Sequence, residues 1–390
     1  MGAGRPPVRR ATRLVALACI IAAAGAMAAE ALRWSHGTQQ VERPAIAIAT
    51  VAAPTPITLN EVSRAIIPMP RGVPSAHASA LATLPGGKLI SFWWAGSRES
   101  GPDVKVYASR WINGAWSDNW VVASRESLGK ALGYGIRRIG NPVAWTAPDG
   151  TLHLYVVATG LGGWAASRIV QLTSGDDGAT FSVRRVLPLS PLFNTSTLVR
   201  TAPVALADGG WWLPLYFEIG NKYPMLMAFD AGGTPQRLAR IGSGTSSLQP
   251  AIVPVSATEV HAWMRDAGEG QRVQQAVSRD GGASWEDLAP TQLANQSTSL
   301  AALRLTNGNF LMLYNHVAAG GSDRNVLSLA LSTDARTWRP LAEIVSGKAG
   351  DEFSYPTMQQ VGDKLHITYT HQRKAIAHHL LRITPGKDHL

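Results

Sequence analysis

The chain repeats one structural unit six times. In each unit an apolar run ends in a short polar turn and a second apolar run follows, as in residues 80–94, 143–157, 204–217 and 300–314. The turns read Pro-Gly-Gly, Pro-Asp-Gly, Asp-Gly-Gly and Thr-Asn-Gly, and an Asn-Gly or Asp-Gly pair between apolar runs is the strongest short signal for a β-hairpin. The first strands of the hairpins begin near His77, Asn141, Thr201, Gln249, Ser299 and Tyr355, at intervals of 48 to 64 residues. A repeat on this scale decides the architecture before any single residue does.

An outer pair of strands is expected after each hairpin, for instance at residues 104–110 and 272–278, and segments with a helical period are almost lacking. A single sheet of this kind cannot bury both of its faces alone. The sequence therefore predicts an all-β fold, a six-bladed β-propeller over residues 56–390, after an N-terminal apolar leader. Residues 56–67 are predicted to add an outer strand to the last blade and close the ring. A β-sandwich is the alternative, but it does not account for hairpins repeated over this length.

The charge and cysteine content narrow the class of protein. The net charge of +10 is spread along the chain, and no nucleic-acid-binding motif accompanies it, so we expect no nucleic acid partner. A basic surface of this kind is either a plain soluble surface or one that attracts anionic glycans or membrane lipids. The only cysteine, Cys19, lies in the leader, which excludes a disulfide framework.

The N-terminus has the layout of an export signal. Four arginines (Arg5, Arg9, Arg10 and Arg13) precede an apolar run from Leu14 to Ala29, which ends in small residues that suit a cleavage site. We expect residues 1–33 to be either a cleaved signal peptide or a signal anchor, with residues 14–32 as the membrane tether, and residues 34–55 to be a linker. In both versions the body lies outside the cytoplasm, in the periplasm or secreted.

Three of the six units close on a further pattern, Ser-x-Asp-x-Gly-x-Ser/Thr-aromatic. The copies are Ser174-Gly-Asp176-Asp-Gly178-Ala-Thr180-Phe181, Ser278-Arg-Asp280-Gly-Gly282-Ala-Ser284-Trp285 and the degenerate Ser332-Thr-Asp334-Ala-Arg-Thr337-Trp338. The Asp carboxylate can accept backbone N–H groups within the turn, and Gly supplies a positive φ. This pattern is the Asp-box, or BNR repeat. The chain resembles the bacterial sialidase (neuraminidase) family over residues 57–383, and within it the predicted-neuraminidase branch.

The resemblance implies an exo-acting glycoside hydrolase that cleaves a terminal sialic or related anionic sugar with retention. In the first unit, Arg98 and Asp103 match the family's second arginine and its general acid/base in type and spacing. His77 stands where the family has the arginine of an Arg-Ile-Pro motif. An imidazole lacks the two-pronged fork with which arginine binds a carboxylate, so His77 is a departure at a substrate-binding position.

Tyr355, at the start of the sixth hairpin, matches the family's nucleophile by position. A neutral phenol avoids repulsion with an anionic substrate, which is why sialidases depart from the two-carboxylate rule. It is a weak nucleophile unless a carboxylate takes its proton. The family's partner glutamate would open the third hairpin, where this chain has Arg200-Thr201-Ala202. We therefore expect Glu218, at the far end of that hairpin, to act as the base.

Two further arginines end hairpins: Arg265 in the fourth unit and Arg373 in the sixth. Together with Arg98 they are predicted to form a clamp for the substrate carboxylate. The amide of Asn141, which opens the second hairpin, is expected to bind sugar hydroxyls, and Gln249 holds the corresponding place in the fourth.

No cofactor or metal is expected, because His371, His378 and His379 lack useful ligand spacing and no Gly-rich phosphate loop precedes a helix. Two alternatives to the hydrolase stay open. One is a polysaccharide lyase or uronic-acid-directed glycosidase that uses His77 and Tyr355 as base and acid. The other is a propeller that binds glycans without catalysis.

Overall fold

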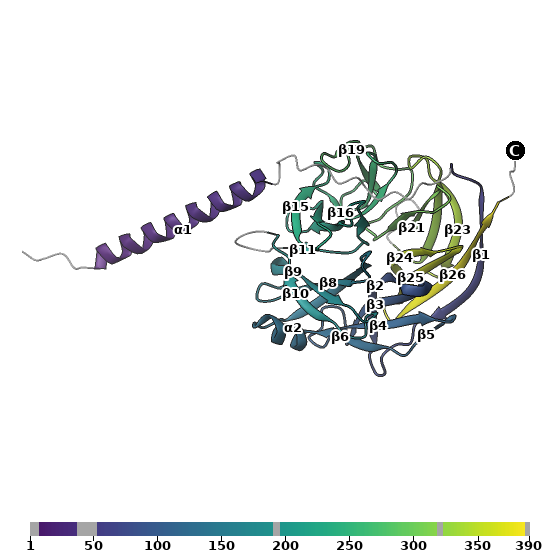
Figure 1. Ribbon diagram of the computed structural model, residues 1–390, viewed down its shortest axis with the longest axis horizontal. Coiled ribbons are helices and arrows are strands. Elements are labelled where there is room, and N and C mark those ends of the chain that lie inside the picture. The colour runs from purple at the N-terminus through teal and green to yellow at the C-terminus, as the bar shows by residue number, and fades with distance from the viewer. Residues whose placement is uncertain (1–7, 37–52, 190–195, 318–322, 387–390) are drawn as a thin grey trace, which may run out of the picture.

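The computed structural model describes residues 8–36, 53–189, 196–317 and 323–386. Six antiparallel sheets surround a central axis, as Figure 1 shows, so the predicted six-bladed β-propeller is confirmed. Most of the linker predicted at residues 34–55 lies outside the described residues, as does Arg5 of the leader.

Each sheet forms one blade, numbered here in chain order. Blade 1 contains β2 (Ser75–Leu84), β3 (Lys88–Gly96), β4 (Lys105–Ile112), β5 (Ala115–Trp116) and β6 (Trp120–Ser124). Blade 2 contains β7 (Arg138–Thr146), β8 (Leu152–Thr159), β9 (Ser167–Ser174) and β10 (Ser182–Val186). Blade 3 contains β11 (Thr197–Leu198), β12 (Val204–Ala205), β13 (Trp211–Phe217), β14 (Tyr223–Phe229) and β15 (Pro235–Arg240).

The second half of the ring follows the same order. Blade 4 contains β16 (Ser247–Pro254), β17 (Val260–Asp266), β18 (Gln274–Ser278) and β19 (Glu286–Leu288). Blade 5 contains β20 (Ala301–Arg304), β21 (Phe310–Asn315), β22 (Val326–Ser332) and β23 (Arg339–Ser346). Blade 6 contains β24 (Phe353–Val361), β25 (Lys364–His371), β26 (Ala375–Pro385) and β1 (Ile57–Ile66).

The ring closes as the sequence predicts. Strand β1 comes from the start of the described body and pairs antiparallel with β26 from its end, from Ile57 opposite Pro385 to Ile66 opposite Ala377, with one shift of register between Glu61 and Ser63. The two strands run side by side along the outer edge of the molecule in Figure 1. Residues far apart in sequence thus share one sheet, and the first and last parts of the propeller stabilise each other.

Two α-helices accompany the strands. Helix α1 (Val8–His36) contains a stretch, Ala11–Ala29, that is long and apolar enough to cross a membrane, and its described side chains are almost all exposed. Helix α2 (Arg125–Leu132) was not predicted. It begins with a capping box between Ser124 and Ser127 and buries Leu128.

The Asp-box turns connect the third and fourth strands of blades 2, 4 and 5. In blade 4, the Ser278 hydroxyl donates to Asp280 Oδ1 at 2.8 Å and accepts the Gly282 N–H at 2.7 Å. The Ser284 hydroxyl donates to the second oxygen of Asp280 at 2.6 Å. Burial alone would raise the pKa of Asp280, but the hydrogen bonds from Ser284, Ser278 and Ala283 lower it to about 2. The carboxylate therefore stays ionised and holds the turn.

Each Asp-box turn also packs against the preceding blade. Phe181 of blade 2 makes an edge contact with Phe92 of blade 1, with ring centroids 5.7 Å apart, and Trp338 of blade 5 does the same with Trp263 of blade 4 at 5.0 Å. A Cβ atom at Gly282 would lie 2.3 Å from the ring of Trp212 in blade 3. The repeated motif is thus a contact between blades as well as a turn.

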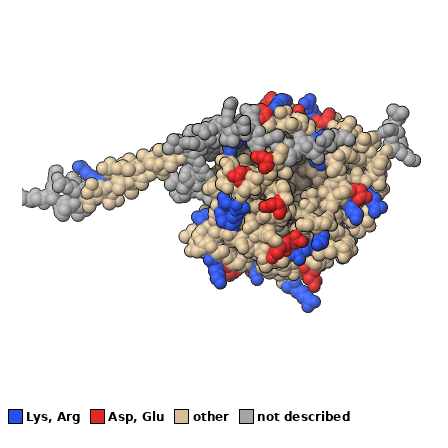
Figure 2. All heavy atoms as spheres, viewed as in Figure 1, with Lys and Arg blue, Asp and Glu red and all other residues tan. Residues whose placement is uncertain are grey.

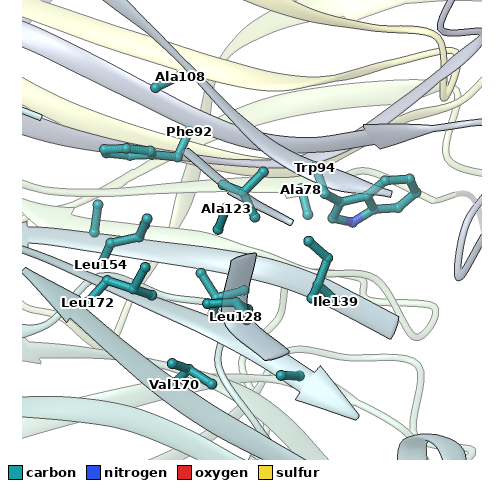
Figure 3. Packing of buried hydrophobic residues seen from close by; sticks show 14 of the residues in the cluster. Ala78, Phe92, Trp94, Ala108, Ala123, Leu128, Ile139, Leu154, Val170 and Leu172 are labelled. Carbon is teal, nitrogen blue, oxygen red and sulfur yellow. The ribbon is translucent and has the colours of Figure 1, made fainter. Parts of the chain in front are cut away.

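Apolar side chains fill the spaces between neighbouring blades. Figure 3 shows the cluster between blades 1 and 2, which joins Phe92 and Trp94 of β3 to Ile139 of β7 and Leu154 of β8, with Leu128 of α2 beneath them. Tyr355 of blade 6 packs against the same cluster. The apolar core between blades 1 and 2 therefore extends to Tyr355, on the inner strand of blade 6.

Candidate functional site

The inner strands of four blades are interrupted by irregular pairing near their starts. The breaks lie between His77 and Ala80, Ile139 and Pro142, Leu248 and Ala251, and Ser354 and Thr357. Three of them contain a non-glycine residue in the left-handed region: Ala78 at φ 57°, Gln249 at φ 55° and Tyr355 at φ 52°. Each costs about 1 kcal/mol, so the surrounding structure must hold it in place, and such strain concentrates at functional sites.

Arg200 and Thr201 of blade 3 form hydrogen bonds to three of these irregular segments, called bulges below. The guanidinium of Arg200 donates to the carbonyl of Pro356 at 2.7 Å, to the carbonyl of Ser79 at 3.3 Å and to the hydroxyl of Ser299 at 3.1 Å. The hydroxyl of Thr201 donates to the carbonyl of Pro250. Arg200 alone thus connects blade 3 to blades 1, 5 and 6, which is achievable only from the central axis.

Arg200 lies at an interruption in the first part of blade 3. Its inner strand is not continuous, because β11 ends at Leu198 and β12 begins at Val204, and Arg200 and Thr201 lie in the gap. Arg200 is 3% exposed, and burial lowers its pKa to about 10. A pKa of 10 still leaves the guanidinium charged at neutral pH, so the axis contains a buried cation where a carboxylate was expected from the resemblance.

Tyr355 and His77 lie against each other beside this cation. Their ring centroids are 4.2 Å apart, and the guanidinium carbon of Arg200 lies 5.1 Å from the Tyr355 ring centroid. His77 is 1% exposed, and neither of its ring nitrogens has a hydrogen-bond partner among the described residues. Burial lowers the pKa of His77 well below its ordinary value, and the charges of Arg373, Arg200 and Arg324 lower it further. His77 is therefore a neutral imidazole with unused hydrogen-bonding capacity.

A second group of cations surrounds Glu352. Its carboxylate accepts a hydrogen bond from Arg373 Nε at 2.6 Å, from Ser354 Oγ at 2.6 Å and from Arg324 at 3.4 Å. Burial alone would raise the pKa of Glu352, but these partners lower it. Arg373 also pairs with Glu99, in the loop after β3. Two acidic residues therefore fix the orientation of Arg373.

Arg265 completes this group. Its guanidinium binds the hydroxyl of Ser297 through Nε at 3.2 Å and Nη2 at 3.1 Å, and Arg324 binds the carbonyl of the same Ser297 at 3.4 Å. Arg265, Arg324 and Arg373, which we call the arginine cluster, are thus linked through Ser297 and Glu352. Sequence reasoning missed Arg324, because it lies just before β22 and no local pattern distinguishes it.

Tyr216 lies near the end of β13, and Glu218 follows that strand directly. Burial raises the pKa of Tyr216, and the charges of Tyr355 and Glu218 raise it further, while Arg265 acts in the opposite direction. The Tyr216 hydroxyl accepts a hydrogen bond from the Gln249 amide at 3.3 Å. Glu218 itself is half-buried.

Arg98 and Asp103 occupy an exposed loop after β3. Both carboxylate oxygens of Asp103 accept hydrogen bonds from Ser97, one from its N–H at 2.7 Å and one from its hydroxyl at 2.7 Å. The Ser97 hydroxyl is the main cause that lowers the pKa of Asp103. The loop approaches the axis through Glu99, whose partner is Arg373, whereas Arg98 is not linked to the arginine cluster by any described hydrogen bond.

Asn141 is half-buried, and its amide donates to the carbonyl of Val199 at 3.3 Å. This contact steadies the segment that carries Arg200.

Among the described residues, no group of three or more His, Cys, Asp and Glu side chains is arranged to hold a metal ion. On the face in Figure 2, basic and acidic side chains are interspersed rather than gathered into a patch of one sign.

Solved structures with the same fold include several sialidases. A Hadza microbial sialidase superposes with a TM-score of 0.65 at 15% identity, covering 79% of this chain and 66% of its own. A mutant of the Trypanosoma rangeli sialidase that displays trans-sialidase activity gives 0.63 at 14% identity, covering 85% and 60%. The NanB sialidase of Streptococcus pneumoniae gives 0.60 at 11% identity, covering 82% and 70%. At these identities the likeness shows the fold alone.

A protein of unknown function from Dyadobacter fermentans is as similar, with a TM-score of 0.65 at 16% identity, covering 84% of this chain and 99% of its own. No curated protein matches the sequence. The family model described as a BNR repeat-like domain matches residues 87–367, well over half of the chain. With its six blades and its Asp-box turns, the chain belongs to the sialidase-like family of BNR-repeat propellers.

Proposed function

We propose that this protein is a retaining glycoside hydrolase of sialidase type, which cleaves a terminal sialic or related anionic sugar. The observation that carries the proposal is the place of Tyr355 at the axis of the propeller, under the guanidinium of Arg200 and three residues after Glu352, which holds Arg324 and Arg373. A neutral nucleophile under concentrated positive charge suits an anionic sugar. The sialidase structures with the same fold agree with this reaction class.

The arginine cluster would bind the substrate carboxylate. Guanidinium groups present paired N–H donors that match the two oxygens of a carboxylate. Glu352 orients Arg324 and Arg373 and Ser297 orients Arg265, so the donors are fixed before the substrate arrives. Arg98 is proposed as an additional contact from the exposed loop, and His77 as a hydrogen-bond donor or acceptor to the same sugar.

Tyr355 would attack the anomeric carbon, and Glu218 would accept its proton. The support for Glu218 is its place, a half-buried carboxylate two residues after Tyr216, whose hydroxyl accepts a hydrogen bond from Gln249 in the inner strand of blade 4. Asp103 is proposed as the general acid/base. The Ser97 hydrogen bonds favour its ionised form, so to act as an acid Asp103 must lose them and take up a proton, which it then gives to the glycosidic oxygen as the bond to the sugar breaks.

The apolar stretch Ala11–Ala29 suits either a signal peptide or a membrane anchor. We propose that the propeller acts outside the cytoplasm, attached to the inner membrane or released after cleavage of the leader. Its partner would be a glycan or glycoconjugate with an anionic end.

The test uses the full-length chain, purified in detergent, with a fluorogenic α-sialoside. We expect turnover by the wild type, a loss of at least a thousandfold in Tyr355→Phe, and a large loss in Asp103→Asn. Thermal melting of the variants would show whether they fold. A folded wild type that releases no sugar from the sialoside contradicts the sialidase assignment.

One observation favours a second candidate, a lyase or glycosidase directed at uronic acids. The ring contact between His77 and Tyr355, with both imidazole nitrogens unpaired among the described residues, suits a base and acid pair. A neutral imidazole would remove the proton next to the uronate carboxylate, and the phenol would protonate the departing oxygen, which leaves an unsaturated uronate. Ultraviolet absorbance that appears with polyuronates, and that His77→Ala abolishes, would support this candidate.

A further inference from the structure

The rim of blade 2 combines exposed cations with exposed apolar side chains. A shallow hollow of about 430 Å³ opens there between helix α2 and the segment that leads into β7. Five residues in and around the hollow, called here the blade 2 rim, are Lys130, Tyr134, Arg137, Leu161 and Arg168. We propose that the blade 2 rim docks on a lipid bilayer that contains anionic phospholipids. The proposal concerns the orientation of the propeller and does not depend on the proposed function.

Contacts between neighbouring segments bring the five residues together. Lys130 and Tyr134 line the same hollow. The guanidinium carbon of Arg168, near the start of β9, lies 5.2 Å from the centroid of the Tyr134 ring. The N–H of Arg137 donates to the carbonyl of the last residue of β8 at 2.7 Å, and Leu161 lies in the loop that follows that strand. The rim is therefore one region of the surface.

The cations of the rim lack acidic partners. No ion pair joins Lys130, Arg137 or Arg168 to a carboxylate among the described residues. One acid, Glu126, lines the hollow, and its carboxylate is paired with Arg125 at 2.6 Å. Three positive charges are therefore left uncompensated. A lysine or arginine close to an anionic bilayer strengthens attachment about fivefold, so the charge of the rim complements negatively charged phospholipid headgroups.

Apolar side chains accompany these cations. Leu161 is 79% exposed, more than any other large apolar side chain that the structure describes, and Tyr134 is 38% exposed. Their segments are in contact, because a Cβ atom at Gly160 would lie 3.8 Å from the carbonyl oxygen of Gly135. A single exposed leucine is ordinary on a protein surface. A leucine and a tyrosine among unpaired cations form the combination with which peripheral proteins enter the headgroup region of a bilayer.

The blade 2 rim lies at the same end of the propeller as the axial site. Trp164, three residues after Leu161, donates through Nε1 to the hydroxyl of Ser100 at 3.1 Å. Ser100 belongs to the blade 1 loop that carries Arg98 and Asp103. A propeller that docks through the rim would therefore turn the opening of its axis toward the bilayer.

The same chain can reach a membrane. The stretch Ala11–Ala29 of α1 is long and apolar enough to cross one. Residues 37–56 join α1 to the propeller, and a chain of that length spans at most about 70 Å. A membrane crossed by α1 would therefore lie within reach of the rim, which favours a bilayer over a soluble polyanion as the partner.

The test places a fluorescent probe at Leu161 in the full-length protein, reconstituted into vesicles. Leu161→Cys is made together with Cys19→Ser, since Cys19 is the only natural cysteine. The vesicles consist of phosphatidylcholine with a headgroup spin label, with or without about 30% phosphatidylglycerol. We expect the spin label to quench a bimane probe at residue 161 about threefold more strongly when phosphatidylglycerol is present.

A probe at Ile112 is the control for position. Ile112 is exposed and lies at the end of β4, on the opposite end of blade 1 from the loop that carries Asp103. Its quenching should stay weak with either lipid. Equal quenching at the two positions would overturn the proposal, as would quenching at residue 161 that does not respond to phosphatidylglycerol.

Reversal of charge identifies the residues in contact with the bilayer. Lys130→Glu combined with Arg137→Glu should reduce the quenching at residue 161 to its level in phosphatidylcholine alone. Lys88→Glu combined with Lys364→Glu makes the same change in net charge at exposed turns on the opposite end of blades 1 and 6, and should leave the quenching unchanged. Equal effects of the two pairs would show that net charge alone attracts the protein, which contradicts docking through the rim.

Two further outcomes are distinguishable. A probe at residue 161 whose spectrum shifts with dextran sulfate, but which is not quenched on anionic vesicles, would assign the rim to a soluble polyanion and overturn the proposal. The quenching measurements need no turnover, so a wild type that hydrolyses no sialoside would contradict the proposed function without affecting this test.

Discussion

The guanidinium of Arg200 lies over the ring of Tyr355 and donates to the carbonyl of Pro356, the residue that follows it. One side chain therefore fixes both the ring of the proposed nucleophile and the left-handed backbone that presents it. Arg200→Lys keeps the positive charge but loses the planar guanidinium that donates to Pro356, Ser79 and Ser299 at once. We expect kcat on the fluorogenic sialoside to fall at least tenfold, with a smaller change in KM, as steady-state kinetics will measure.

Arg304→Lys is the control for this variant. Arg304 also lies over an aromatic ring, that of Phe310 at 5.3 Å, and donates to a backbone carbonyl, but it is bound to Val255 rather than to the bulges at the axis. Its replacement should lower the melting temperature without the loss in kcat. Equal losses in kcat for the two variants would show that Arg200 acts only through stability.

Arg324 is expected to contribute more to substrate binding than Arg98. Arg324→Gln removes a guanidinium that is linked to Glu352 and Ser297, so the KM for an anionic substrate should rise about tenfold or more. Arg98→Gln removes an exposed side chain and should change KM less than threefold. Michaelis–Menten kinetics of both variants on the same sialoside will test this. A larger rise in KM for Arg98→Gln than for Arg324→Gln would show that Arg98 is the stronger contact to the substrate carboxylate.

Gly282→Ala is expected to destabilise the propeller by about 2 to 4 kcal/mol. The added Cβ would meet the Trp212 ring at 2.3 Å and would also require φ 86° of an alanine. Gly281→Ala is the matched control, since its φ is 71° but its nearest contact is the Ala257 carbonyl oxygen at 4.0 Å, so only about 1 kcal/mol is expected. Chemical denaturation measures both, and equal losses would refute a contact between blades at the Asp-box.

Buried histidines should make the protein less stable in acid. Burial lowers the pKa of His366 to about 4 and that of His378 to about 3, and the two rings share a hydrogen bond of 3.0 Å. Their pKa values in the unfolded chain lie near 6.5, so below that pH the unfolded chain binds more protons than the folded one. The stability is complete above pH 6.5 and is lost as the pH falls toward 3.

Urea unfolding at pH 7.5 and pH 5 measures this loss, which should reach up to about 2 kcal/mol for each buried histidine. His378→Gln should reduce the dependence on pH, whereas His316→Gln, which removes an exposed imidazole, should leave it unchanged. A pH dependence that is the same in wild type and His378→Gln would show that this pair does not cause it.

The six blades and the closing strand were predictable because their signals are local. A hairpin depends on its turn residues and on the alternation of its own strands, and the Asp-box pattern marks three outer turns. Helix α2 was missed because it has only eight residues, and the Ser124–Ser127 capping box gives a weak signal without a long apolar period.

The site was harder to predict because its parts meet only after the ring has closed. Tyr355 was predicted from the family resemblance and its place at the start of the sixth hairpin, and Arg373 from its place at the end of the same hairpin. The gap in the third inner strand, and the contacts of Arg200 with three other blades, depend on bulges that the sequence does not mark. Arg324 joins the cluster through Ser297 and Glu352, which belong to different segments of the chain.

The carbonyls bound by Arg200 and Thr201 also bear on how this repeat protein unfolds. An open array of repeats can lose its terminal units one at a time, since each contacts only its neighbours. Here one dipeptide of blade 3 is bonded to blades 1, 4, 5 and 6, and β1 seals the ring at the opposite edge. None of these blades can unfold without breaking hydrogen bonds at the centre of the ring. The propeller should therefore melt in a single cooperative transition despite its modular sequence.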